Sequence, residues 1–235
     1  MIEISQIRKL SLWIFFVPLI AINFCLFISL NYHLLENTFF TVDQIGRSNF
    51  SIPYLDGSLS ISRASRTFPQ YLIFKPAMVL TSLLLYFYWC KNNELINKFK
   101  NTFNKNYSFK IFGITSAIFL SIHALLLGVE LDIKIFKFLR RVVLLGFIIF
   151  EIIAQVLLVY NFYKLKKKIS HFFYEKILHV KILLVTSLSI VAILSLPILL
   201  IDSNIHFKHA LEWNYFLGVI SFYLLTRFFW INNNL

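Results

Sequence analysis

Two arginines, Arg63 and Arg66, follow a run of serines in a polar stretch of the chain. A guanidinium group matches the oxygens of a phosphate or carboxylate in a two-pronged geometry, and serine hydroxyls supply further hydrogen-bond donors. We therefore predict that Arg63 and Arg66, with Ser60 and Ser62, bind the headgroup of a lipid. The alternative is that Asp56 pairs with one of the arginines and simply holds the segment together.

The residues around these arginines are typical of a tight turn. Pro53 fixes its own backbone angle, and the dipeptide Asp56-Gly57 is a strong turn signal. Pro69 ends the segment with a second rigid position. We expect these residues, together with Tyr54, to shape the loop that presents the arginines.

A second group of polar residues, His123, Glu151 and Gln155, lies inside long apolar stretches. Ionisable groups are costly in hydrocarbon and usually face a partner or a cavity. Counted by the helical rise, His123 and Glu151 differ in depth by only about 5 Å, so a direct or water-mediated pair is feasible. Gln155 follows Glu151 by one turn and shares its face. The group either joins helices without any turnover or forms a proton relay or headgroup site.

A third group, His206, His209 and Glu212, repeats every three residues. Two histidines and a carboxylate can hold a metal that activates water. However, His206 falls in a short connection that need not be helical, so we predict no metal here and expect His209 and Glu212 to anchor the neighbouring loop. The sequence contains no GxSxG, HExxH, P-loop or Rossmann pattern. We therefore expect no cofactor and no catalysis by this protein itself.

The elements that must position these groups are six long apolar stretches separated by short connections rich in Lys and Arg. Each approaches the roughly 20 residues that an α-helix needs to cross about 30 Å of hydrocarbon. The predicted spans are 10–30, 72–90, 111–130, 142–160, 182–200 and 211–231, with one long loop at 31–71. The fold class is thus all-α: a multi-pass membrane protein whose 235 residues form a single integral domain.

The charge pattern favours membrane lipids as partners. A net charge of +12 would suggest nucleic acid for a soluble protein, but here most Lys and Arg lie in the connections at the bilayer surface. Anionic phospholipids are therefore the expected partner, and nucleic acid is not. Because basic residues favour the cytoplasmic side, we predict that both termini are cytoplasmic and that the loop at 31–71 is on the outer side.

Two regions of the chain resemble a known family. The loop carries Pro53-Tyr54-Leu55-Asp56, then Ser60-Ile61-Ser62, then Phe68-Pro69-Gln70-Tyr71-Leu72-Ile73-Phe74-Lys75, and the sixth stretch carries Glu212-Trp213 and Phe222-Tyr223-Leu224-Leu225-Thr226. These resemble the six-span DRAM and FRAG family, which includes DRAM autophagy modulators, the factor that remodels the lipids of GPI anchors and a yeast SFK-type protein linked to phospholipid asymmetry. The chain departs from the family by inserting Ser-Arg-Ala-Ser-Arg before Pro69.

The resemblance implies lipid handling or membrane organisation rather than a defined reaction. Our leading prediction is a protein that binds lipid headgroups and influences lipid distribution or the processing of lipid anchors. One alternative is a membrane-embedded hydrolase or acyl-transfer enzyme with a metal held by His123, Glu151, His209 and Glu212. Another is a proton-coupled transporter, which would need a polar path from Glu151 to both faces.

Overall fold

The computed structural model describes residues 2–35, 38, 52–100, 108–129, 134–200 and 204–231. Within these ranges the regular structure is helical, apart from an isolated antiparallel bridge between Phe173 and Trp230. Six helices are long: α1 (Ile2–Leu30), α4 (Tyr71–Lys100), α5 (Ser108–Leu126), α6 (Lys134–Ile169), α7 (Glu175–Leu200) and α8 (Ile205–Phe229). Four are short: η1 (Tyr32–Leu35), α2 (Pro53–Asp56), α3 (Ile61–Arg66) and η2 (Ser170–Phe172).

Five of the long helices have the length and composition needed to cross a membrane. They contain the segments Ile2–Leu30, Tyr71–Phe99, Phe109–Leu126, Phe138–Phe172 and Glu175–Ser195. The prediction of an all-α, multi-pass membrane protein is thereby confirmed. The sixth predicted span lies in α8, a 25-residue helix that lacks a sufficiently apolar run to count with the other five.

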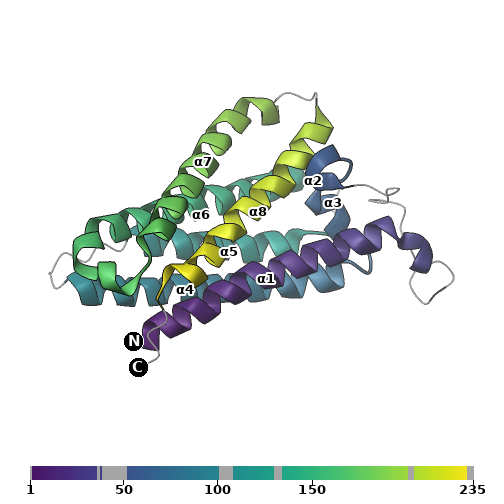
Figure 1. Ribbon diagram of the computed structural model, residues 1–235. Coiled ribbons are helices and arrows are strands. Elements are labelled where there is room, and N and C mark those ends of the chain that lie inside the picture. Colours follow the sequence, from purple (N-terminus) through teal and green to yellow (C-terminus); the bar gives the residue numbers. More distant parts are fainter. Residues whose placement is uncertain are drawn as a thin grey trace.

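Successive long helices run in opposite directions along one bundle (Figure 1). α1 packs on α4 and α8, α5 packs on α4 and α6, and α7 packs on α6 and α8. The start of α1 and the end of α8 consequently lie at the same end of the bundle, which we call the terminal end. The opposite end, where α2 and α3 lie, is the lid end, and residues 52–70 are the lid (Figure 1).

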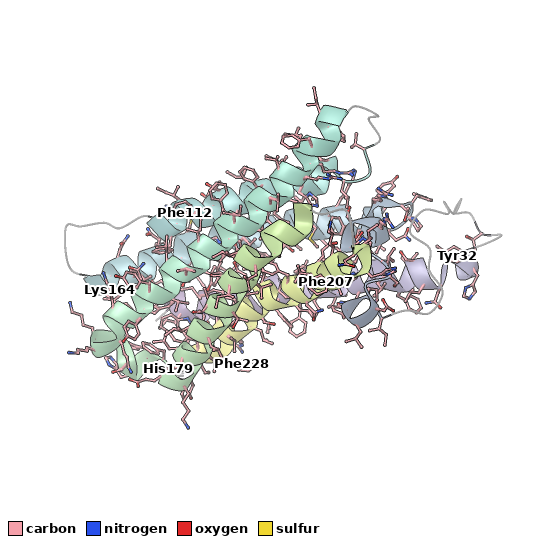
Figure 2. The ribbon with its side chains drawn as sticks, turned by 90° about the horizontal axis from the view of Figure 1, so that it is seen from above. Tyr32, Phe112, Lys164, His179, Phe207 and Phe228 are labelled. Carbon is pink, nitrogen blue, oxygen red and sulfur yellow. The ribbon has the colours of Figure 1, made fainter. Side chains whose placement is uncertain are left out.

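Large aromatic side chains fill the interior. Trp89, Trp213, Tyr88 and Tyr223 are fully buried, and the rings of Tyr88 and Tyr223 meet edge to face with centroids 5.0 Å apart. Apolar side chains also cover the outside of the bundle, as the side-chain view shows (Figure 2). Trp13, for example, is 58% exposed on α1. An apolar exterior around a packed aromatic interior is what a bilayer solvent selects.

At the terminal end, the connection between α6 and α7 is paired with the last residues of α8. The amide of Tyr174 donates to the carbonyl of Phe229 at 3.0 Å, and the amide of Ile231 donates to the carbonyl of Phe172 at 2.9 Å. Outside a helix these backbone groups need such partners wherever lipid excludes water.

Candidate functional site

The lid is fixed to both helices beneath it by side chains. The hydroxyl of Tyr54 donates to the side-chain oxygen of Asn23 on α1 at 2.9 Å. From α8, the amide of Asn214 donates to the carbonyl of Tyr54 at 2.7 Å, and the indole of Trp213 donates to the carbonyl of Leu59 at 2.7 Å. These bonds tie one segment to α1 and α8 at once, and so hold the lid in a defined position.

Gly57 allows the lid to approach α8 closely. Its φ is +60°, a backbone conformation that favours glycine, and its amide donates to the carbonyl of Pro53. A Cβ atom here would lie only 1.7 Å from the carbonyl oxygen of His206. The carbonyl of Gly57 also lies 2.9 Å from Nδ1 of His209. The turn that the sequence predicted is therefore also the point where lid and α8 touch.

Asp56 holds this turn by accepting hydrogen bonds from backbone amides. Its carboxylate accepts from the amide of Ser58 at 2.8 Å and from the amide of Ile52 at 2.9 Å. The bond from Ser58 is the main reason that the pKa of Asp56 lies below its ordinary value. Within the described structure, Asp56 forms no ion pair with Arg63 or Arg66, which removes the alternative in which it would neutralise one of them.

Ser60 and Glu212 organise the start of α3. The hydroxyl of Ser60 accepts the amide of Arg63 at 3.1 Å and so caps the helix, a role that the sequence analysis did not assign to it. The carboxylate of Glu212 faces the backbone amides of Ile61 and Ser62 from α8. His209 and Glu212, which the sequence analysis grouped with His206, thus contact different parts of the lid. His209 contacts Gly57, and Glu212 contacts the start of α3.

The two arginines face different neighbours. Arg63 lines a depression of about 500 Å³ between the lid and the start of α8, together with Ser58, Asn204, Ile205, His206 and His209. In the part of the chain that the structure describes, the lining includes no carboxylate. The backbone of Arg66 instead abuts Gly128 at the end of α5, and its side chain is close enough to Arg140 on α6 for mutual repulsion. Of the two arginines, only Arg63 is thus among the described residues that line the depression.

Inside the bundle, Glu151 of α6 is the centre of a polar cluster to which four helices contribute. The hydroxyl of Ser116 on α5 donates to its Oε2 at 2.6 Å, and the amide of Gln155 donates to its Oε1 at 3.0 Å. Tyr223 of α8 donates to the same Oε1, and the indole of Trp89 on α4 faces the carboxylate. Glu151 and Gln155 are both fully buried.

His123 does not belong to this cluster, so the pair with Glu151 that the sequence made feasible is not formed. On α5 the residue at the level of Glu151 is Ser116, and His123 lies about 10 Å farther towards the lid end. There it is 7% exposed, neighbours Arg140, and its Nδ1 has no hydrogen-bond partner.

A buried lysine was missed by the sequence analysis, which placed it in a basic connection. Lys181 is fully buried in α7, donates to the hydroxyl of Thr226 at 2.7 Å and lies 3.9 Å from the ring centre of Phe222. The hydroxyl of Tyr88 is also bonded to Thr226, at 3.2 Å. The sequence shows the aromatic residues and the threonine of α8 that contact Lys181. It does not show that a lysine from another helix, α7, lies against them.

The four residues of the metalloenzyme alternative do not converge. His209 contacts Gly57, Glu212 faces α3, Glu151 lies inside the bundle and His123 neighbours Arg140. Among the residues described, no group of three or more histidine, cysteine or acidic side chains could hold a metal ion. These four side chains are therefore too scattered to bind one metal ion together.

Comparison with protein-family models, with curated proteins and with solved structures finds no match for this chain.

Proposed function

We propose that this protein is a six-span membrane protein that binds phosphate-bearing lipid headgroups at its lid end and influences the distribution of lipids or the processing of lipid anchors, without a reaction of its own. The observation that carries the proposal is the depression between the lid and α8, which Arg63, His206 and His209 line and in which no carboxylate is among the described lining residues. A guanidinium beside imidazole, hydroxyl and amide groups matches an anionic, oxygen-rich headgroup.

The rigidity of the lid supports this role. Arg63 is exposed, but the helix that carries it is capped by Ser60 and held near α8 through Trp213. A side chain on a fixed backbone loses less entropy on binding than one on a free loop. The depression, at about 500 Å³, has the size of a small-molecule site.

The proposed sixth crossing is α8. Its 25 residues extend about 37 Å, enough for hydrocarbon of ordinary thickness. It packs along α1 and α7, and an even number of crossings agrees with the start of α1 and the end of α8 lying together (Figure 1). The basic residues Lys166, Lys167 and Lys168 lie at the terminal end, and because such residues favour the cytoplasmic side, we propose that both termini are cytoplasmic and that the lid is outside.

Membership of the DRAM and FRAG family is also a proposal. Its support is that the two regions of resemblance touch each other: Tyr54 packs on Trp213 with ring centroids 4.8 Å apart, and Glu212 faces the backbone of Ile61 and Ser62. If the lid and α8 segments that resemble the family form one conserved structural unit, they should contact each other, as they do here.

Arg63→Ala tests the headgroup site in lipid nanodiscs. The protein is placed in nanodiscs that contain phosphatidic acid, and the phosphatidic acid that stays bound to the protein after extraction is counted. Nanodiscs of phosphatidylcholine alone are the blank. Loss of a charge-assisted contact worth about 1.5–3 kcal/mol should weaken retention about tenfold or more. Lys168→Ala removes the same charge from an exposed position at the terminal end and should leave retention unchanged.

Two results would overturn the proposal. One is equal retention by the wild type and Arg63→Ala. The other is an equal loss in both variants, which would mean that only the overall charge matters. Free inorganic phosphate, added as a competitor, separates a site for phosphate alone from one that needs the lipid.

A further inference from the structure

The surroundings of Glu151 consist of groups that can donate hydrogen bonds. Ser116, Gln155 and Tyr223 all donate to its carboxylate, and Trp89 faces it with an indole N–H. Such an arrangement satisfies an ionised carboxylate, which can only accept. A carboxylate held by dipoles in a bundle interior needs no paired cation if its donors are complete.

The charged and titratable groups around Glu151 can be named helix by helix. From α4 it is faced by Tyr88 and the neighbouring Trp89, and from α8 by Tyr215 and Tyr223. The groups that contact it from α5 and α6 are Ser116 and Gln155, which do not titrate. In the described part of the chain, no Lys, Arg or His contacts this carboxylate. Lys181 of α7 is instead bonded to Thr226.

Ser116 can also accommodate the protonated form. Its Oγ lies 2.6 Å from Oε2 of Glu151 and 2.8 Å from the carbonyl oxygen of Gly113, one turn earlier on α5. A hydroxyl carries one hydrogen, so it can donate to only one of these two acceptors at a time. When Glu151 is ionised, the hydrogen points to Oε2. When Oε2 carries a proton, that proton points to Oγ and the serine hydrogen turns to Gly113.

Both states are therefore fully hydrogen-bonded at Ser116 with the heavy atoms unmoved. The exchange is a simple proton equilibrium: one proton from water adds to a lone pair of Oε2, and only the serine hydroxyl rotates. Oε1 keeps its bonds from Gln155 and Tyr223 in either state.

We propose that Glu151 is an exchangeable proton-binding site inside the bundle and that Ser116 is its reversible hydrogen-bond partner. The site is independent of the headgroup depression, which lies at the lid end and shares no residue with it. Proton uptake replaces charge-assisted bonds with weaker neutral ones, so it loosens the contacts that Glu151 makes with α5 and α8.

Infrared difference spectroscopy of the purified protein in nanodiscs tests this directly. Lowering the pH should produce, beside the C=O absorption of exposed carboxyl groups, a separate C=O band from a buried protonated carboxyl that disappears again at high pH. The band should be absent from Glu151→Gln and present in Glu175→Gln, a control that removes an exposed carboxylate at the start of α7. A band that is absent or constant throughout the pH range in which the protein is folded overturns the proposal.

Two variants keep the carboxyl and test its partners, even if Glu151→Gln does not fold. Ser116→Ala removes a strong bond from the ionised state and a weaker one from the protonated state, so the midpoint of the band should move upward by about one pH unit. Tyr223→Phe should shift it in the same direction. In Ser116→Ala the band should also change frequency, because the carboxyl proton has lost its acceptor. An unchanged midpoint and frequency in Ser116→Ala overturns the role of Ser116.

Discussion

The indole nitrogen of Trp213 on α8 donates a 2.7 Å hydrogen bond to the carbonyl of Leu59 in the lid, and both residues are buried. One bond thus joins parts of the chain separated by 154 positions in sequence. Since the lid carries Arg63, the position of this guanidinium depends on a contact made by a helix at the other end of the sequence.

Trp213→Phe should therefore destabilise the protein by about 1–3 kcal/mol, because a smaller aromatic ring replaces the indole and the buried carbonyl of Leu59 loses its donor. Thermal unfolding in detergent measures the change. Trp13→Phe is the matched control, since that indole is exposed on the outside of α1. Equal shifts for the two variants would show that the bond to Leu59 contributes nothing.

Gly57→Ala should release the lid from α8. The positive φ alone costs roughly 1–3 kcal/mol, and the methyl group would overlap the carbonyl of His206. Limited proteolysis should cut the variant within the lid at protease concentrations that leave the wild type intact. Leu55→Ala changes a neighbouring residue that is 80% exposed and should resist cleavage like the wild type.

Asp56→Ala should lower stability at neutral pH and have little effect in acid. The amides of Ser58 and Ile52 hold the pKa of Asp56 below its ordinary value, so its contribution is present above the unfolded pKa of about 4 and is lost as the pH falls through the lower folded value. The measurement is the difference in unfolding temperature between wild type and variant as a function of pH. A difference that grows on acidification would contradict the bonding seen at this turn.

Thr226→Val should cost about 1.5–3 kcal/mol, because it removes the hydroxyl that accepts from Lys181. In a Lys181→Met background the same substitution should cost much less, since no buried amine is then left without an acceptor. Lys181→Met alone should be close to neutral, as replacing buried charge with apolar volume often is. Unfolding of the four proteins in the double-mutant cycle measures the coupling, and additive effects would rule out the bond.

The membrane-crossing helices were predictable because a run of apolar residues near the thickness of a bilayer has few other uses. α8, which we propose as the sixth crossing, is the informative exception. Its first turns must bond to the lid through His209, Trp213 and Asn214, and these polar side chains dilute the apolar signal. The residues of α8 that bond to the lid are thus among those that leave its most apolar stretch less apolar than the corresponding stretches of the other five long helices.

The contacts of the candidate sites were less predictable than the helices. Depth along a helix can be counted from sequence, but the direction in which a side chain points depends on how the helices are rotated, and that is why Ser116 rather than His123 meets Glu151. Arg63 and Arg66 illustrate the same difficulty, since different helices flank each of them. Ser60 did carry a readable signal, because serine just before a short helix is a preferred cap.

The pairing of Tyr174 with Phe229 and of Phe172 with Ile231 has a mechanical consequence. It fastens the hairpin of α6 and α7 to the tail of α8, so α7 cannot slide lengthwise past α8 without breaking both bonds. Any rocking between these two helices would then hinge at the terminal end, where the bonds lie, and swing widest at the lid end, beside His206 and Arg63.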